Sequence, residues 1–346
     1  MSSEQVAAAA GSAVFRPQST AEKLRARHVP LDGLVASARG FEELAIRRLT
    51  ADDPVQGVAV VGASGAGKSS FVAWVVDQLP DTFAAIRLPV SALSDPTDAS
   101  EVLKLTLSTV LEIIELDAAE REQVHIDRAD QRTAARAPTG LTGGKIGGGP
   151  IPASINIEVG SLRQEFNENK LAGEYLNAVR RIVAILVHKG ITPVFVFEDT
   201  EAIVGGVDEA AVTQGFFGGP LRQFVEEIDA PCLVAVQTHL TENNEAYARL
   251  SATIEVIKIP HLQAEAPDAL ARILERCLDV SETVSCRLGE IIAPDALAAL
   301  VQFYDETSGD VRKTLAAAHT ATEEAAAMGA QEVRAAHVRI GVSDWR

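Results

Sequence analysis

The chain has 346 residues, enough for one large or two modest domains, and 47% of them are hydrophobic, which is ample for a packed core. Its 48 acidic and 31 basic side chains leave a formal net charge of −17, so the chain as a whole is not a polyanion binder. Three widely spaced cysteines argue against a disulfide framework and a zinc site, which fits a reducing cytoplasm. No apolar run approaches the ~20 residues that a membrane-spanning helix needs.

Helical and strand patterns alternate through most of the chain. The first 20 residues, rich in alanine and serine, are predicted to form a disordered arm. Residues 21–49 indicate two helical pieces broken at Pro30. Short apolar runs typical of buried strands follow at residues 57–61, 83–88, 193–197, 231–236 and, more weakly, 254–259. Helical patterns separate them, at residues 68–79, 101–116, 171–189 and 211–227.

This alternation predicts one α/β domain and a helical domain after it. Buried strands between helices favour a three-layer α/β fold with a mainly parallel five-stranded sheet, over residues 21–263. Residues 121–161 fit neither pattern, because they turn glycine-rich before a short alternating apolar run, and we interpret them as an insertion. Residues 264–346 carry only helical patterns, which predicts a separate all-helical domain.

The stretch from Gly62 to Ser69, GASGAGKS, fits the phosphate-binding loop pattern G-x-x-x-x-G-K-[ST]. A predicted strand precedes it and a predicted helix follows it, so backbone N–H groups and the positive end of the helix dipole would face an anion. Lys68 would reach the β- and γ-phosphates, and Ser69 would hold Mg²⁺. A glycine turn that matches by accident is the alternative. The predicted nucleotide-binding residues are Gly62, Ala63, Ser64, Gly65, Ala66, Gly67, Lys68, Ser69 and Ser70.

Hydrolysis of a bound nucleotide needs a second carboxylate site, which Glu198 and Asp199 supply after the apolar run at residues 193–197. This is the Walker B form, in which Glu198 would face the metal through water and Asp199 would orient the attacking water. The usual order is Asp then Glu. Because Asp199 is one methylene shorter than the usual Glu, the attacking water could be misplaced, which leaves the rate of hydrolysis open. The alternative is a solvated acidic turn.

With these two motifs, the chain resembles AAA+ ATPases over about residues 25–340, especially the origin-recognition-like initiators and helicase loaders, and the strongest evidence is a C-terminal segment. The stretch from Ser308 to Leu315, SGDVRKTL, is similar to the G-D-x-R signature at the start of that family's sensor 2 helix. The resemblance implies an ATPase with an AAA+ core followed by a helical lid, in which Arg312 would reach from the lid to the γ-phosphate. The alternative is a helix-capping Gly-Asp pair with a surface arginine.

Other positions resemble the same family more loosely. Gln237 and Thr238 end a stretch that looks like the sensor 1 strand, whose polar tip positions water. Arg249 lies in a region that looks like the one carrying the arginine finger, which completes a neighbouring subunit's site; Arg222 is the second choice, and a surface arginine is the alternative for both. Residues 28–30 and 39–42 resemble the N-terminal linker that cradles adenine.

The insertion holds the best candidate contact with nucleic acid. Arg128, Arg132 and Arg136 are spaced i, i+4, i+8, so they would form one basic stripe on a helix, and Lys145 follows in the glycine-rich part. In initiator-type AAA+ proteins, insertions at this point face the central channel and contact DNA. Because acidic residues lie among these arginines, a solvated, ion-paired helical face is the alternative.

The resemblance leaves three functions open. The first is an ATP-hydrolysing protein that forms homo-oligomers with Mg²⁺ and ATP at the subunit interfaces and acts on DNA or a DNA-associated partner. The alternative is a nucleotide-switched regulatory or defence-system ATPase that assembles with protein partners without contacting DNA. The acidic composition and the expected lack of a winged-helix domain after the lid favour this alternative. The third is a nucleotide-holding scaffold with little turnover. We expect a cytoplasmic location and no membrane partner.

Overall fold

The computed structural model describes residues 3–51, 57–113, 172–203, 209–262 and 268–343. The chain divides into two compact units. One, called here the lid-and-loop unit, comprises Met1–Leu44, Val61–Val75 and Lys258–Arg346. The other, called the sheet unit, comprises Ala45–Val60 and Val76–Ile257. None of the described helices has both the length and the hydropathy that crossing a lipid bilayer requires.

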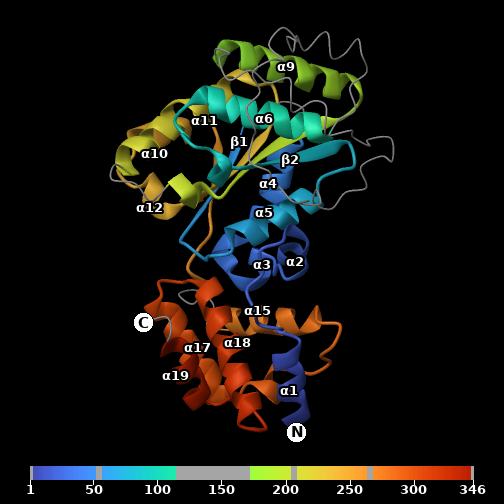
Figure 1. The fold of residues 1–346 in the computed structure, drawn as a ribbon, viewed down its shortest axis with the longest axis vertical. Helices are drawn as coiled ribbons and strands as arrows, with labels where there is room; N and C mark the ends of the chain where they lie inside the picture. Colours follow the sequence, from blue (N-terminus) through green and yellow to red (C-terminus); the bar gives the residue numbers. More distant parts are fainter. Residues whose placement is uncertain (1–2, 52–56, 114–171, 204–208, 263–267, 344–346) are drawn as a thin grey trace, which may run out of the picture. The chain divides into compact units, whose positions relative to one another are not determined.

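A five-stranded parallel sheet forms the centre of the α/β part of the fold (Figure 1). Its order is β2-β3-β4-β1-β5. The strands are β1 (Gly57–Gly62), β2 (Phe83–Pro89), β3 (Thr192–Glu198), β4 (Cys232–Gln237) and β5 (Glu255–Lys258). Every residue of β1 and β4 is buried, as expected for inner strands of a parallel sheet covered on both faces. The predicted parallel five-stranded sheet is therefore confirmed.

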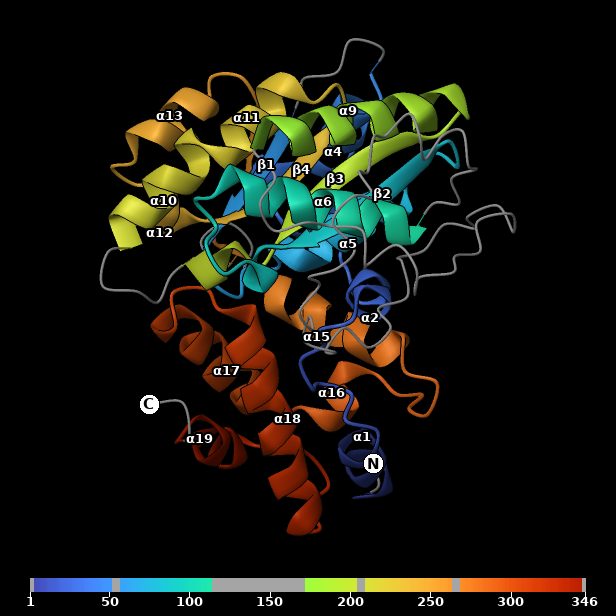
Figure 2. The same cartoon turned by 45° about the horizontal axis from the view of Figure 1, so that its top comes forward.

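Helices of the sheet unit pack against β2 and β3. Two long helices, α6 (Ala99–Ile113) and α9 (Ala172–His188), contact these strands and each other (Figure 2). Three Phe side chains form the core beneath them: the Phe224 ring lies 4.8 Å from that of Phe195 and 5.0 Å from that of Phe197, both edge to face. The other helices wholly within the described residues of this unit are η2 (Val90–Ala92), η4 (Thr200–Ile203), α10 (Glu209–Gly218), α11 (Pro220–Glu227), α12 (Thr238–Thr241) and α13 (Glu245–Leu250).

The single helix predicted over residues 211–227 is wrong, because the chain forms α10 and α11 instead. The break falls at Gly219 and Pro220, and Pro220 is the first residue of α11. Proline has no N–H to donate to a preceding turn, so it begins a helix more readily than it continues one. Both pieces still bury apolar side chains, among them Phe216 and Phe217 in α10 and Leu221 and Phe224 in α11.

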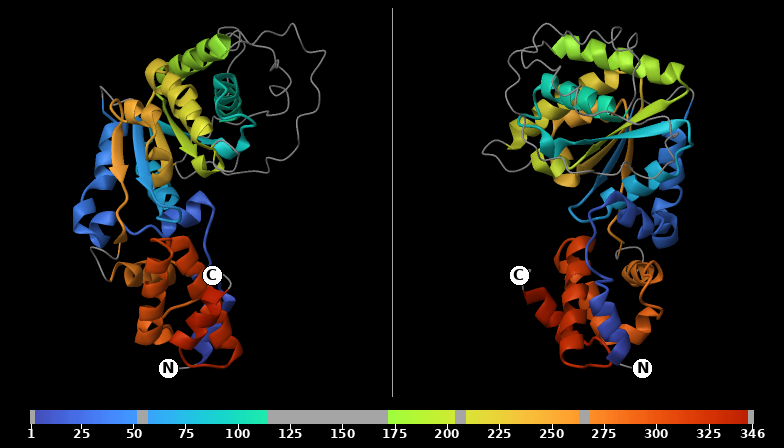
Figure 3. Two further views of the ribbon diagram at one scale, coloured as in Figure 1. Left: turned by 90° about the vertical axis from the view of Figure 1, so that its left-hand side faces the viewer. Right: turned by 45° about the vertical axis from the view of Figure 1, so that its right-hand side comes forward.

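The lid-and-loop unit is helical apart from the ends of strands and one isolated bridge between Ile292 and Val333. Its C-terminal helices are shown in orange and red in Figure 3. They are α15 (Ala269–Asp279), α16 (Leu288–Ile291), α17 (Pro294–Glu306), α18 (Val311–Ala327) and α19 (Ala335–Ser343). Fully buried apolar residues such as Leu300, Ala317 and Ala321 make its core. The predicted helical C-terminal domain is confirmed.

The N-terminal segment also belongs to this unit. Its helices are α1 (Ser3–Gly11), α2 (Ala21–Ala26), α3 (Leu31–Leu34), η1 (Ala36–Ala38) and α4 (Phe41–Leu49), of which α4 runs on into the sheet unit. The predicted disordered arm over residues 1–20 is corrected by α1, which packs against α18 and α16 (Figure 2). Val6 and Ala9, three residues apart on one face, are buried, and alanine is the best helix former. The composition of residues 1–20 suggested disorder because composition does not reveal that the face with Val6 and Ala9 packs against α18 and α16.

Candidate functional site

The phosphate-loop motif connects β1 to α5 (Lys68–Asp77). Gly65 and Gly67 have φ of +68° and +98°, the left-handed region that favours glycine. Lys68 is buried, and its ammonium donates to the carbonyl oxygens of Gly62 at 3.1 Å and Ala63 at 2.8 Å. The lysine side chain is therefore folded back onto its own loop. Those two hydrogen bonds are ones that phosphate oxygens could replace.

The lid motif meets this loop within the lid-and-loop unit. Val311 N–H, at the start of α18, donates to the Gly65 carbonyl oxygen at 3.1 Å. Next to it, the Asp310 carboxylate is packed so closely over Gly65 that an added Cβ would lie 1.8 Å from Asp310 Oδ1. The phosphate loop and the G-D-x-R turn, far apart in the chain, are thus in direct contact.

The turn that carries Asp310 is tightly constructed. Ser308 and Gly309 both have positive φ, +56° and +86°, which ends α17 and redirects the chain into α18. A Cβ on Gly309 would come within 2.8 Å of the His261 ring. Asp310 caps α18, because its Oδ1 accepts the Lys313 N–H at 2.9 Å. Arg312, the second residue of the helix, is exposed.

A buried polar chain holds the N-terminal segment to the loop helix α5. The Ser70 hydroxyl donates to the Leu24 carbonyl oxygen at 3.0 Å and lies 3.4 Å from His28 Nδ1. On the other side of the ring, His28 Nε2 is 3.2 Å from Glu42 Oε1, which also accepts the Leu31 N–H at 2.7 Å. The Ser70 hydroxyl is engaged here, so its predicted part in nucleotide binding stays a prediction. Sequence reasoning did not identify Glu42 as the partner of His28.

At the end of β3, Glu198 is held by an arginine that sequence reasoning missed. Arg87 Nη1 lies 2.5 Å from Glu198 Oε1, and both side chains are about one-fifth exposed. The pair follows from strand register, since β2 and β3 run parallel with Arg87 opposite Val196. Arg87 Nε and Nη2 are buried without a hydrogen-bond partner among the described residues. A charged residue inside the apolar run at residues 83–88 was the signal that could have revealed it.

Asp199, the residue after Glu198, differs from it in backbone conformation and in its side-chain partner. Its φ of +57° places it in the left-handed region, which aspartate tolerates better than most residues. The Ser91 hydroxyl donates to Asp199 Oδ2 at 3.3 Å, and the Asp199 side chain is exposed. Thr200, the next residue, is buried and donates to the Ala235 carbonyl oxygen at 2.5 Å. This contact ties the turn after β3 to the neighbouring strand β4.

The structure separates the remaining candidates. Gln237 is buried at the end of β4, whereas Thr238 is exposed at the start of α12. Arg249 pairs with Glu245 at 3.3 Å and its side chain is 71% exposed; Arg222 pairs with Glu226 at 2.6 Å and is 46% exposed. Exposed ion pairs within one helix contribute little to stability. The stripe predicted at Arg128, Arg132, Arg136 and Lys145 lies outside the described residues.

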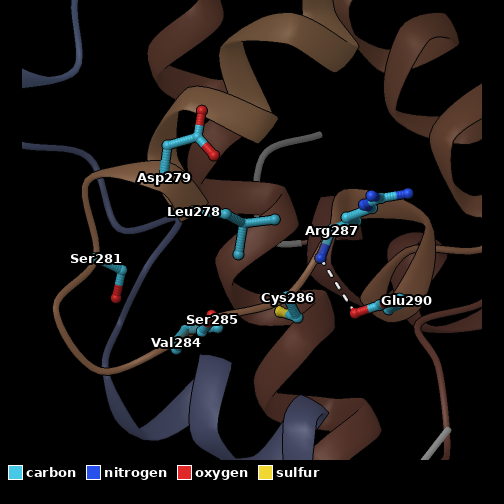
Figure 4. Close-up of a pocket in the computed structure, with 8 residues that line it drawn as sticks. All are labelled: Leu278, Asp279, Ser281, Val284, Ser285, Cys286, Arg287 and Glu290. Carbon is cyan, nitrogen blue, oxygen red and sulfur yellow. Dashed lines mark hydrogen bonds between the residues drawn. The ribbon is translucent and has the colours of Figure 1, made fainter.

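A separate cavity of about 470 Å³ lies between α15 and α16 of the lid-and-loop unit (Figure 4). It is lined by Leu278, Asp279, Ser281, Val284, Ser285, Cys286, Arg287 and Glu290. Within it, the Arg287 N–H donates to Glu290 Oε2 at 3.2 Å, which closes the start of α16. None of the predicted nucleotide-site residues lines this cavity.

The three cysteines are expected to differ sharply in reactivity, because only the thiolate is nucleophilic. Burial raises the pKa of Cys232 to about 12 and that of Cys277 to about 11. Cys286 is part-exposed in the cavity, and its pKa is raised first by burial and then by the Glu290 carboxylate. A thiol-reactive disulfide compound should therefore label only Cys286 in the native protein. Because the pKa of Cys286 is raised, its labelling rate should increase at a higher pH than the labelling rate of free cysteine does. Cys286→Ser should remove that reaction; rapid labelling of two or more native thiols would contradict the burial.

No protein-family model matches the sequence, and no curated protein matches it. Solved structures do match its fold. The Orc1 protein of Aeropyrum pernix in complex with DNA is similar over 92% of this chain, with 17% identity and a TM-score of 0.52. The Orc2 protein of that organism in its ADP form is similar over 96% of this chain, with 14% identity and a TM-score of 0.53. Cdc6p of Pyrobaculum aerophilum is also similar over 96% of this chain, with 12% identity and a TM-score of 0.51.

The chain covers 66%, 72% and 70% of those three chains, respectively. At such low identity the likeness concerns the fold alone. The shared fold has a five-stranded parallel sheet with helices and a helical C-terminal domain. The chain therefore has the AAA+ fold that is found in archaeal Orc1/Cdc6 initiator proteins.

Proposed function

We propose that this chain binds ATP with Mg²⁺ at Gly62–Ser69 and hydrolyses it, and that the nucleotide controls its assembly and its action on DNA or a DNA-associated partner. The contact between the phosphate loop and the lid motif carries the proposal: Val311 N–H donates to the Gly65 carbonyl oxygen. Because the first residue of α18 is hydrogen-bonded to the phosphate loop, a nucleotide that binds the loop would also affect the position of this helix. Two similar structures support it, since Aeropyrum pernix Orc2 was solved with ADPNP and ADP, and Orc1 with DNA.

The loop fits a magnesium nucleotide. Gly65 and Gly67 leave the backbone free of Cβ atoms, and the buried Lys68 ammonium donates to two loop carbonyl oxygens that phosphate oxygens would replace. Mg²⁺ beside a bound nucleotide is held largely through phosphates, water and one or two protein oxygens. Ser69 and Glu198 would hold the ion, which when bound neutralises phosphate charge.

Glu198 and the phosphate loop are assigned to the same nucleotide because of strand order. Strands β1 and β3 are parallel members of one sheet, with β4 between them, so the segments that follow them leave the same edge of the sheet. The Arg87 guanidinium forms an ion pair with the Glu198 carboxylate, with 2.5 Å between Arg87 Nη1 and Glu198 Oε1. The ion pair with Arg87 would compete with water or metal for Glu198 Oε1, and this competition supports slow turnover.

The remaining residues act on the γ-phosphate or across a subunit interface in this proposal. Gln237, or Thr238, positions the water, Asp199 orients it, and Arg312 reads the γ-phosphate. Arg249 is the arginine finger for a neighbouring copy, a role that its exposed side chain permits. Contact with DNA would come from the insertion residues Arg128, Arg132, Arg136 and Lys145.

Turnover of ATP, measured with Glu198→Gln and a matched Glu201→Gln variant, tests the catalytic part of the proposal. Glu201 is a second carboxylate three residues further along, in η4. Glu198→Gln is expected to lower kcat by about 100-fold, because an amide can neither take a proton nor hold the metal's charge. ATP binding should change little, and Glu201→Gln should turn over like wild type. Equal turnover in wild type and Glu198→Gln would overturn the assignment of Glu198.

The partner is tested by particle size and ATPase rate, measured with ATP and with ADP, with and without double-stranded DNA. DNA-dependent rate or assembly supports the proposal. If nucleotide changes particle size but DNA changes neither, the alternative takes its place, a regulatory or defence-system ATPase that assembles with protein partners, as the net charge of −17 favours. Mixing inactive Arg249→Ala and Lys68→Ala subunits should restore part of the activity if Arg249 acts in the neighbour's site.

A further inference from the structure

The lid helix α18 uses the phosphate loop as part of its N-terminal cap. The first N–H groups of any helix have no partner inside the helix. Here Val311 N–H donates to the Gly65 carbonyl oxygen at 3.1 Å, and Lys313 N–H donates to Asp310 Oδ1 at 2.9 Å. The loop therefore supplies one acceptor and the capping side chain supplies another. If the loop changes shape, α18 loses a hydrogen bond at its first residue.

Gly65 is the point where this contact excludes any larger residue. A Cβ there would lie 1.8 Å from Asp310 Oδ1 and 2.4 Å from its Cγ. Gly67, two residues on in the same loop, also has a positive φ, but a Cβ there would meet nothing within 4 Å. Both positions need glycine for the backbone, and only Gly65 also needs it for the lid. The two glycines thus form a matched pair for separating loop strain from lid contact.

Asp310 is held in place by several contacts. The residue is 6% exposed, its Oδ1 accepts the Lys313 N–H, and its backbone carbonyl oxygen accepts from both the N–H and the hydroxyl of Thr314. Gly309 before it is fixed against the His261 ring. Asp310 therefore cannot move away from Gly65 without moving the start of α18. A displacement of the loop at Gly65 becomes a displacement of the lid helix.

We propose that Gly65, Asp310 and Val311 form a latch through which the occupied phosphate loop holds the lid helix in place, with Asp310 as a positioning residue. Phosphate bound by the loop and α18 docked on it both select one left-handed conformation at Gly65. Two events that select the same conformation favour each other, so the nucleotide strengthens lid docking and docking strengthens nucleotide binding by the same factor. This inference rests on the proposed nucleotide binding, whereas the contacts among Gly65, Asp310 and Val311 can be tested without adding nucleotide.

Amide hydrogen exchange over residues 308–316 tests the latch in the nucleotide-free protein. Gly65→Ala should raise the exchange rate at Val311 by about tenfold, because the hydrogen bond to the loop is lost. Gly67→Ala strains the same loop without touching the lid, and should leave that rate within about twofold of wild type. Equal effects of the two substitutions would show that loop strain, and no latch, opens the lid.

A second-site variant keeps the test informative if Gly65→Ala is poorly folded. Asp310→Ser retains a capping hydroxyl for the Lys313 N–H but removes the carboxylate that a Cβ at residue 65 would strike. Asp310→Ser should therefore restore protection at Val311 in the Gly65→Ala protein to within about threefold of wild type. In the Gly67→Ala protein it should restore nothing. Additive effects of Gly65→Ala and Asp310→Ser would overturn a direct contact.

The last measurement repeats the hydrogen exchange of residues 308–316 with magnesium ADP added. Magnesium ADP should increase protection of residues 308–316 about tenfold in wild type and leave them unchanged in Lys68→Ala. If Lys68→Ala binds the nucleotide as well as wild type does, the proposed function fails. If wild type binds it without added protection, nucleotide binding stands and the latch fails as a means of transmission.

Discussion

Replacing Lys68 with alanine is expected to weaken binding of magnesium ATP by about 30- to 1000-fold. A charged hydrogen bond to an anion is worth about 2–4 kcal/mol when one partner is truncated, which corresponds to that range in dissociation constant. Lys68 is the only lysine of the loop, and its ammonium already lies within 3.1 Å of two loop carbonyls, on the loop itself. Isothermal titration or fluorescence with an ADP or ATP analogue measures the loss directly.

The fold should survive this substitution. Removing the ammonium leaves the Gly62 and Ala63 carbonyls without their lysine donor, which costs about 1 kcal/mol of unfolding free energy. The matched control is Lys258→Ala, since Lys258 is an exposed lysine at the end of β5. That variant should bind nucleotide like wild type. Unchanged ATP affinity in a folded Lys68→Ala protein would refute nucleotide binding at this loop.

Replacing Phe224 with alanine is expected to lower the free energy of unfolding by about 3–5 kcal/mol. The Phe224 ring is 1% exposed and packs edge to face on both Phe195 and Phe197, so its removal leaves a cavity beneath β3. The loss combines lost apolar burial with unfilled space. Denaturant titration of the full chain, with the slope checked for two-state behaviour, measures it.

The same helix provides the control for that prediction. Arg222, two residues earlier in α11, is exposed and pairs with Glu226 one turn away. Arg222→Ala should change the unfolding free energy by no more than about 0.5 kcal/mol. Phe224→Ala should also lower ATP turnover, since Phe197 immediately precedes Glu198. A loss below about 1 kcal/mol would mean that the surrounding side chains collapse into the space.

Much of the architecture was predictable because the responsible residues are close together in the chain. The apolar runs at residues 57–61 and 193–197 predict strands, and the structure places β1 and β3 there. The helical C-terminal domain followed in the same way from periodicity. Two predictions about the chain outside these runs were wrong. Helix α1 replaces the disordered arm, and the break at Pro220 divides a helix that apolar periodicity had joined.

The site was predictable only in its local parts. The loop from Gly62 to Ser69 is defined by consecutive residues, and its strand–loop–helix context is likewise local. The carboxylates Glu198 and Asp199 were visible for the same reason. Their partners were not, because Arg87 reaches Glu198 through the pairing of β2 with β3, and Ser91 reaches Asp199 from the segment after β2.

What the sequence by itself determined is the alternation of strands and helices, and it predicted the loop motif at Gly62–Ser69 and the carboxylates Glu198 and Asp199; all of these depend on neighbours a few residues apart. Only the tertiary structure decided which carboxylate is paired with Arg87 and that Asp310 lies against Gly65. The physical reason is that these contacts join residues whose approach is set by strand order and by the docking of α18, which no local pattern encodes. The lid's contact with the loop belongs to that second kind of information.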